Sequence, residues 1–343
     1  MTVALFTLGG TIAMAGTCAG DRDGGDDRDG SDARSAPVVT RLTGADLTAA
    51  VPGLDVPLEV HDTHAVPSAD LTFRQLLDLV DEASKAVLAG AAGVVVTQGT
   101  DTLEESAFLA DLVWPHPEPF VLTGAMRNPT LAGPDGPANL LAAARVAAAD
   151  EARGLGALAV LNDQIHSARR VRKAHATSTA AFISPDTGPL GHVIEGRVRI
   201  LTRPPRRAPL GTGECENIRV ALHTVTLDDD GAQLAGLADT HQGLVVAGFG
   251  VGHVPSALAP VLGALATRIP VVLTSRTGGG SVLSHTYGSV GSETDLQRRG
   301  LINGGLLDPY KARVLLRLLL ANDANDANDA NQNAIAKAFL LHG

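Results

Sequence analysis

The sequence predicts an α/β protein in which a large N-terminal domain, built on a parallel sheet, is followed by a smaller α/β C-terminal domain. Short apolar runs rich in β-branched residues alternate with segments of helical periodicity along most of the 343 residues. Such runs are typical of strands buried on both faces of a parallel sheet. The alternation favours strands joined by crossover helices, and the length is sufficient for two domains.

Seven apolar runs are predicted to be strands. They lie at residues 2–7, 93–97, 120–123, 157–162, 219–224, 244–247 and 270–274. The first two differ from the others because each leads directly into a glycine turn that carries a threonine, Thr11 or Thr100. Parallel sheets hold their ligands at the carboxyl ends of their strands. We therefore expect both turns to face a ligand.

Two segments have the form of a capping box, in which a threonine is followed three residues later by Gln or Glu. The first, at 72–75, opens a predicted helix. Its apolar face carries Leu76, Leu77, Val80, Ala83 and Val87. The second, at 102–105, directly follows Thr100 and Asp101. It predicts that this pair lies at a helix N-terminus, where backbone N–H groups favour negative charge.

A proline-rich segment at 199–216 predicts the domain boundary because it lacks any periodicity. We expect an N-terminal domain at 1–198 and a C-terminal domain at 217–343, with 199–216 as the linker.

Two other segments have a simple composition. Residues 16–37 are rich in Gly, Asp, Arg and Ser, and this predicts a mobile loop. Calcium binding is the alternative, but the spacing fits no EF-hand loop. The Asn-Asp-Ala repeat at 321–331 predicts an inert insertion before a last helix at 334–341.

The composition argues against several classes of protein. A net charge of −10 disfavours a nucleic-acid groove, which needs a basic surface. No apolar stretch reaches the ~18 residues of a membrane span, and the N-terminus lacks the basic start of a signal peptide. We therefore expect a cytoplasmic protein. The two cysteines, Cys18 and Cys215, do not indicate a disulfide framework.

No metal or organic cofactor is predicted. His61 and His64 have a spacing that could chelate a metal, but no third ligand pattern accompanies them. The turn at Gly9, Gly10 and Thr11 lacks the spacing of a dinucleotide fingerprint, and no phosphate-binding lysine follows it. Residues 275–280 are predicted to be a subunit-contact loop or a tight turn.

Thr11 and Thr100 are the candidate nucleophiles. A threonine hydroxyl is a weak nucleophile until a neighbouring base takes its proton. Asp101 follows Thr100, and Lys173 lies beyond the strand predicted at 157–162. Because a lysine in a protein interior can act as a base, Thr100, Asp101 and Lys173 could form a proton relay. Taken alone, threonines in such turns are more often caps than nucleophiles, and Lys173 could belong to a solvated basic face.

Taken together, these motifs resemble those of the bacterial-type L-asparaginase family. The matching segments occur in order over nearly the whole chain, at 8–13, 98–105, 124–127, 135–140, 173–175 and 308–316. The two threonine turns and the lysine segment together make the resemblance specific, whereas a lone Gly-Gly-Thr would not.

The resemblance implies an amidohydrolase that converts L-asparagine to L-aspartate and ammonia through a threonine acyl-enzyme. Thr11 would attack the side-chain amide carbon, and Thr100, Lys173 and Asp101 would form the proton-relay triad. Asp101 would also hold the α-ammonium of the substrate. Ser68 would bind its α-carboxylate, although a loop cap is an equally simple role for this serine.

The resemblance also implies the surroundings of the reaction. Backbone N–H groups of the two turns would stabilise the oxyanion, and Gly10 and Gly99 would let the substrate approach the backbone closely. No cofactor would be required. Because the sites of this family lie between subunits, a homodimer or homotetramer is implied.

The chain departs from the family at three places. Many members carry a tyrosine in the loop after the first threonine, but the only tyrosines here are Tyr287 and Tyr310. Where secreted members supply a glutamate from the neighbouring subunit, the nearest matches are Tyr287 and the displaced Glu293. Ala69 stands where the family often has glutamine. These differences leave the preference between asparagine and glutamine open.

Three alternatives therefore stand beside an L-asparaginase. The chain could be a glutaminase/asparaginase of mixed specificity, or the amidase subunit of a tRNA-dependent amidotransferase. It could also be a non-catalytic amino-acid-binding sensor on the same fold. Binding of ligand without turnover would distinguish the sensor from the enzymes.

Overall fold

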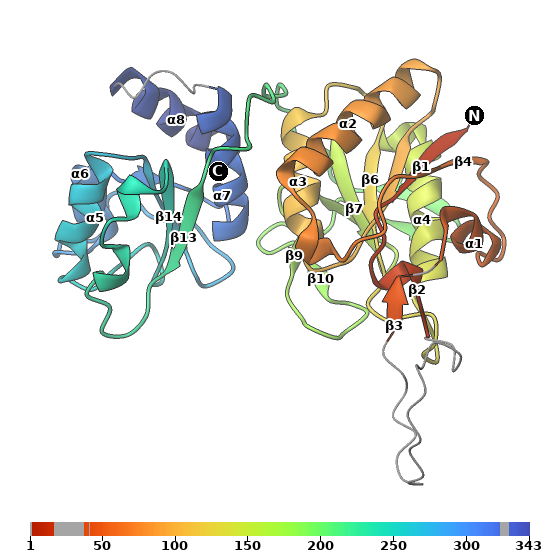
Figure 1. Cartoon of the computed structure of the whole chain (residues 1–343), viewed down its shortest axis with the longest axis horizontal. Helices are drawn as coiled ribbons and strands as arrows, with labels where there is room; N and C mark the ends of the chain where they lie inside the picture. The colour runs from red at the N-terminus through yellow and green to blue at the C-terminus, as the bar shows by residue number, and fades with distance from the viewer. Residues whose placement is uncertain (1, 17–37, 41, 323–328) are drawn as a thin grey trace, which may run out of the picture. The chain divides into compact units, whose positions relative to one another are not determined.

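The structure is a computed structural model of the chain (Figure 1). It describes residues 2–16, 38–40, 42–322 and 329–343. The chain divides into two compact units. The larger comprises Met1–Ser184 and Pro189–Arg207, and the smaller comprises Pro185–Gly188 and Ala208–Gly343. The strand β12, Arg197–Ile200, belongs to the larger unit and occupies the first two residues of the segment predicted to be a linker.

The larger unit is built on an eight-stranded sheet. In spatial order its strands are β12, β11 (Gly191–Ile194), β8 (Gln164–Ser167), β7 (Ala157–Leu161), β6 (Phe120–Thr123), β5 (Val94–Thr97), β1 (Val3–Thr7) and β4 (Leu58–Asp62). The last five of these are parallel, whereas β8, β11 and β12 pair antiparallel. The sheet is therefore mixed, and the predicted parallel arrangement extends only from β4 to β7.

A two-residue turn causes this change of direction. Leu161 pairs with Gln164, so that only Asn162 and Asp163 connect β7 to β8. Both residues have positive φ, 52° and 58°, which is the conformation that Asn and Asp adopt in tight hairpins. Asn162 was predicted to end a strand, but it is instead the first residue of the turn.

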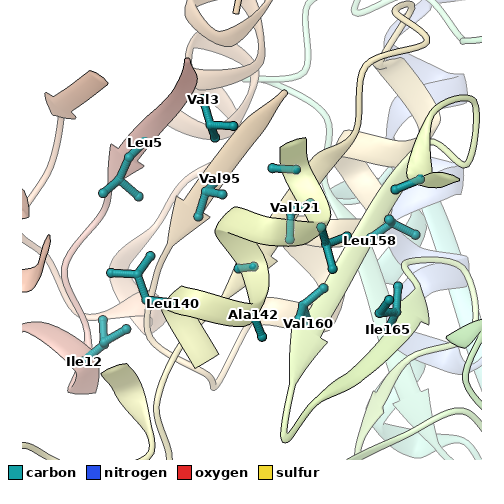
Figure 2. Packing of buried hydrophobic residues seen from close by; sticks show 14 of the residues in the cluster. Val3, Leu5, Ile12, Val95, Val121, Leu140, Ala142, Leu158, Val160 and Ile165 are labelled. Atoms are coloured by element: carbon teal, nitrogen blue, oxygen red, sulfur yellow. The ribbon is translucent and has the colours of Figure 1, made fainter. Parts of the chain in front are cut away.

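Helices cover both faces of this sheet. On one face lie α1 (Gly44–Ala49) and α4 (Gly136–Ala148), and their apolar residues form one cluster with alternate residues of the strands (Figure 2). Strand residues of this cluster include Val3, Leu5, Val95, Val121, Leu158 and Val160. On the other face, α2 (Phe73–Leu88) packs on β1, and α3 (Leu103–Val113) packs on β6 and β7. Burial of each such aliphatic side chain stabilises the fold by roughly 1.5–3 kcal/mol.

One of the two predicted capping boxes is confirmed. Thr72 Oγ1 accepts a hydrogen bond from Gln75 N, and Gln75 Oε1 accepts one from Thr72 N at 2.9 Å. The box predicted at 102–105 is wrong, because the Thr102 hydroxyl caps no N–H group. It donates instead to the carbonyl of Ser68 at 2.9 Å and so joins two loops.

The smaller unit contains a parallel four-stranded sheet, as an α/β domain predicts. Its strands, in spatial order, are β13 (Val220–Thr224), β14 (Gly243–Gly248), β15 (Val271–Ser275) and β16 (Ile302–Asn303). Its helices are α5 (Leu258–Ala266), α6 (Glu293–Arg298), α7 (Pro309–Asn322) and α8 (Asp329–His342). Helix α8 begins inside the Asn-Asp-Ala repeat, so that the last helix starts earlier than the predicted residue 334.

Short elements complete the described chain. β2 (Met14–Gly16) pairs with β3 (Val38–Thr40), and β9 (Arg172–Lys173) pairs with β10 (Phe182–Ile183). Single 3₁₀ turns are η1 (Thr11–Ala13), η2 (Ser68–Asp70), η3 (Asp150–Ala152), η4 (Ala232–Leu234) and η5 (Leu237–Asp239). The loop predicted at 16–37 lies outside the described residues from residue 17 onward, as does Cys18.

Two kinds of feature are absent from the residues that the structure describes. None of the helices there has the length and apolarity needed to cross a membrane. No group of three or more His, Cys, Asp or Glu side chains in that part of the chain could hold a metal ion.

The buried histidine of β8 makes stability depend on pH. Burial lowers the pKa of His166 from 6.5 to about 4, and the nearby His192 adds to this shift. As the pH falls through 6.5 the unfolded chain takes up a proton, while folded His166 stays neutral until about pH 4. The free energy of unfolding is therefore highest, as far as His166 is concerned, above pH 6.5. It falls by about 3 kcal/mol between pH 6.5 and pH 4.

Chemical denaturation at a series of pH values checks this expectation. The variant His166→Asn lacks the titrating ring, so its free energy of unfolding should decline less than that of the wild type between pH 6.5 and 4. Parallel declines for the two proteins would contradict the assignment.

Candidate active site

The first threonine turn is fixed by the residues that follow the threonine. After β1, Gly9 and Gly10 take positive φ values of 89° and 86°, which L side chains rarely adopt. The chain then forms η1, in which Ile12 and Ala13 are buried in the same cluster as residues of α4. Figure 2 shows Ile12 near Leu140 of α4. Thr11 itself remains partly exposed. Burial of its two neighbours therefore holds Thr11 at the carboxyl end of β1.

The second turn lies against the first. Leu8 N donates to Thr97 O at 2.9 Å, which joins the ends of β1 and β5. A Cβ atom added to Gly10 would lie only 2.1 Å from the backbone N of Gly99 and 2.3 Å from its Cα. No side chain fits at Gly10, because real Cβ atoms do not approach backbone this closely. The two glycine turns are thus in direct backbone contact.

Three predicted relay residues meet in this unit. Lys173 Nζ donates to Thr100 Oγ1 at 3.0 Å and to Asp101 Oδ1 at 2.7 Å. Thr100 is buried, the Lys173 side chain is 16% exposed and the Asp101 side chain is 72% exposed. The lysine therefore lies between a buried hydroxyl and a carboxylate open to solvent.

Ser68 lies beside the second turn with its hydroxyl uncommitted. A Cβ atom added to Gly99 would be 2.7 Å from Ser68 Oγ. The residue is only 3% exposed, and Ser68 Oγ has no hydrogen-bond partner among the described residues. A buried polar group without a partner costs about 1–3 kcal/mol. A polar group of a ligand at this turn would remove that cost.

Sequence reasoning assigned no role to Asp135 and Asn139. The Asp135 carboxylate accepts hydrogen bonds from the N–H groups of Met126 and Arg127, the latter at 2.8 Å. Asn139 Nδ2 donates to Gly124 O at 2.9 Å, and Asn139 Oδ1 accepts from Asn162 N at 2.9 Å. Both residues lie at the start of α4, and their hydrogen bonds fix the backbone that follows β6 and β7. Two polar residues four positions apart at the start of a helix lie on the same side of it. This spacing was the sequence feature that could have indicated their shared role.

The smaller unit contains the other two predicted substrate residues. Glu293 is fully buried, and its Oε1 accepts from Thr286 N at 3.0 Å and Tyr287 N at 2.8 Å. Its Oε2 lies 3.1 Å from His253 Nε2. Burial acts to raise the pKa of Glu293, but these hydrogen bonds hold it below its ordinary value. The carboxylate of Glu293 is therefore occupied within its own loop.

Tyr287 has the opposite character, because 48% of the residue is exposed. Its backbone is fixed on both sides: its N–H donates to Glu293, and its carbonyl accepts from Ser292 Oγ at 2.7 Å. The ring of His253 packs edge-on against the tyrosine ring, with centroids 4.9 Å apart. The loop thus presents an ordered aromatic side chain to solvent in the described unit.

The N-terminal and C-terminal parts of the chain each match a known protein family. Residues 2–206 match the family described as "Asparaginase, N-terminal", and residues 219–332 match "Glutaminase/Asparaginase C-terminal domain".

Individual proteins agree with this match. A probable L-asparaginase of Deinococcus radiodurans is 37% identical over 279 residues, which are 79% of this chain and 84% of that protein. A glutaminase-asparaginase of Pseudomonas fluorescens biotype A is 30% identical over 331 residues, covering 93% of this chain and 86% of that protein. The crystal structure of a probable cytoplasmic L-asparaginase from Campylobacter jejuni superposes with a TM-score of 0.82, at 30% identity and 99% coverage of both chains.

The contact between the two turns can be tested by stability. The substitution Gly10→Ala forces a side chain into the Gly99 backbone, whereas Gly53→Ala changes a glycine of similar φ, 70°, that has open space around it. We expect Gly10→Ala to lower the free energy of unfolding by at least about 2 kcal/mol more than Gly53→Ala. Denaturant titration of the two variants measures this difference, and equal losses would contradict the contact.

Proposed function

The chain belongs to the asparaginase family, and from this we propose that it is an L-asparaginase, which hydrolyses L-asparagine to L-aspartate and ammonia. The observation that carries the proposal beyond family membership is the pair of contacts from Lys173 Nζ to Thr100 and Asp101. They unite a hydroxyl, an amine and a carboxylate beside the turn that carries Thr11. Such a set can move a proton to and from a threonine nucleophile.

In the proposed reaction the Thr11 hydroxyl attacks the side-chain amide carbon of asparagine. Its proton passes to the relay of Thr100, Lys173 and Asp101, and the tetrahedral intermediate collapses with protonation of the leaving nitrogen. Ammonia departs and an ester to Thr11 remains. A water molecule, deprotonated by the same relay, then attacks this ester and releases aspartate and the free hydroxyl. Each step conserves atoms and protons, and the net change is the addition of one water molecule.

Backbone groups of the two turns are proposed to stabilise the oxyanion. No side chain fits between Gly10 and Gly99, so a substrate bound beside the two turns would meet their backbone N–H groups. One oxyanion donor is typically worth about 3–4 kcal/mol of the barrier.

We propose that the α-substituents of the substrate are recognised by Asp101 and Ser68. The Asp101 carboxylate is largely exposed and complements an ammonium group. Ser68 offers a buried hydroxyl that has no partner within the described chain, which suits a carboxylate acceptor. Binding both groups would fix the side-chain amide in one orientation.

A homodimer or homotetramer in the cytoplasm is the proposed state of the protein. In it the loop of Tyr287 and Glu293 would contribute to substrate binding in a neighbouring subunit. Tyr287 is the better candidate of the two, because its ring is exposed while the carboxylate of Glu293 is buried and occupied. The cytoplasmic location is supported by the Campylobacter jejuni structure, described as that of a probable cytoplasmic L-asparaginase.

Mixed specificity for glutamine is the second candidate function. Two observations favour it: one relative is a glutaminase-asparaginase, and Ala69 provides only a methyl group next to Ser68.

The nucleophile is tested by the variant Thr11→Val, which keeps the branched shape and loses the hydroxyl. We expect ammonia release from L-asparagine to fall at least about a thousandfold, because no ester can form. The assay uses purified wild type and variant with L-asparagine and L-glutamine in parallel. A variant that keeps wild-type turnover would contradict the proposal. Binding of asparagine by a wild type without turnover would instead indicate a sensor.

The relay is tested by Lys173→Met, which removes the amine and keeps the length of the side chain. We expect kcat for asparagine to fall by about 10²–10⁴, the usual contribution of positioned acid–base catalysis. Lys85→Met is the matched control, because Lys85 is an exposed lysine of α2. The relay would be contradicted if the two variants had the same kcat.

A further inference from the structure

The catalytic lysine proposed above belongs to a very short two-stranded antiparallel ribbon. Lys173 belongs to β9, which pairs with β10 through only two residue pairs, one of them Lys173 with Phe182. One flanking backbone bond, from Ala174 N to Ala181 O at 2.8 Å, extends this ladder. A two-stranded ribbon of this size is not stable by itself. Its position therefore depends on what anchors it to the large sheet.

A buried histidine provides a side-chain anchor. His166 lies in β8 of the eight-stranded sheet, and its Nδ1 is 2.8 Å from Ser184 Oγ. Ser184 directly follows Ile183, the last residue of β10. Both partners are buried, with His166 only 1% exposed. The hydrogen bond thus joins the lysine-bearing ribbon to a strand of the core.

The chemistry of the pair argues against a role in packing alone. The other ring nitrogen, Nε2, is buried and has no partner among the described residues. A leucine at 166 with an alanine at 184 would fill much of the same space without leaving a polar atom uncompensated. Since an orphaned donor is rarer in proteins than an orphaned acceptor, we assign Nδ1–H as donor to Ser184 and Nε2 as the bare acceptor.

We propose that His166 is a positioning residue for Lys173. Its hydrogen bond to Ser184 fixes the ribbon of β9 and β10, so that Lys173 Nζ stays within reach of Thr100 and Asp101. The catalytic consequence rests on the function proposed above, whereas the position of the amine does not.

Kinetics of four single variants and one double variant test the consequence for catalysis. His166→Leu and Ser184→Ala each remove the bond, and His166→Asn keeps an N–H donor near the position of Nδ1–H. Ile165→Val trims the neighbouring core residue of β8 and leaves the bond intact. We expect the first two to lower kcat about tenfold with KM little changed, because displacement of a catalytic group is costly. The double variant with His166→Leu and Ser184→Ala should have a kcat no lower than either single variant. His166→Asn should restore most of the lost kcat.

Amine labelling tests the position of Lys173 without any turnover. The chain has four lysines, Lys85, Lys173, Lys311 and Lys337. Brief acetylation followed by peptide mass spectrometry gives the labelling rate of each. We expect Lys173 to react several-fold faster, relative to exposed Lys85, in His166→Leu and Ser184→Ala than in wild type. In Ile165→Val and His166→Asn the ratio should stay near the wild-type value.

The outcomes separate the two proposals. A wild type without turnover would overturn the proposed function, and the labelling ratios would still decide the role of His166. The positioning role would be overturned by unchanged labelling in His166→Leu and Ser184→Ala. It would equally be overturned if Ile165→Val lowered kcat as much as His166→Leu, since general loss of core stability would then explain the effect.

Discussion

The close approach of the two glycine turns is the constraint on which the rest of the site depends. Gly10 and Gly99 come so near each other that a single added carbon atom would overlap the opposite backbone. This contact requires that β1 and β5 be adjacent and parallel, because only then do their carboxyl ends meet. It also requires buried neighbours: Ile12 holds one turn in the core beneath α4. A substrate bound beside the two turns would therefore meet closely packed backbone, whose donors are already in place for the reaction.

The other residues of the site are held in place by two different kinds of contact. Asp135 and Asn139 hold the chain beyond β6 and β7 through a dense set of hydrogen bonds within one helix start. Lys173 arrives instead on a ribbon of two residue pairs, outside the large sheet. Its amine must therefore be held by contacts beyond the ladder, and the bond between His166 and Ser184 is one of them.

Much of the fold followed from local pattern, and its errors have physical causes. Buried runs such as that at 120–123 predicted strands well, because β-branched residues between glycines and helices leave few alternatives. The antiparallel strand β8, Gln164–Ser167, was not predicted because Ile165 is its one aliphatic residue, so that it forms no apolar run. Thr102 was misassigned because a capping pattern does not show that a nearer carbonyl, that of Ser68, competes for the hydroxyl. The anchoring role of His166 depends on a contact across 18 residues, which no local pattern contains.

We propose that Thr11, served by the neighbouring relay, carries the reaction through a covalent intermediate. The most direct test is the mass of the enzyme when turnover of L-asparagine is stopped within milliseconds by acid. If Thr11 is the nucleophile, a fraction of the protein will be heavier by one aspartyl group. The adduct will lie on the peptide that contains Thr11 and will be absent in Thr11→Val. An adduct on Thr100, or full turnover in a protein that never carries an adduct, would contradict it.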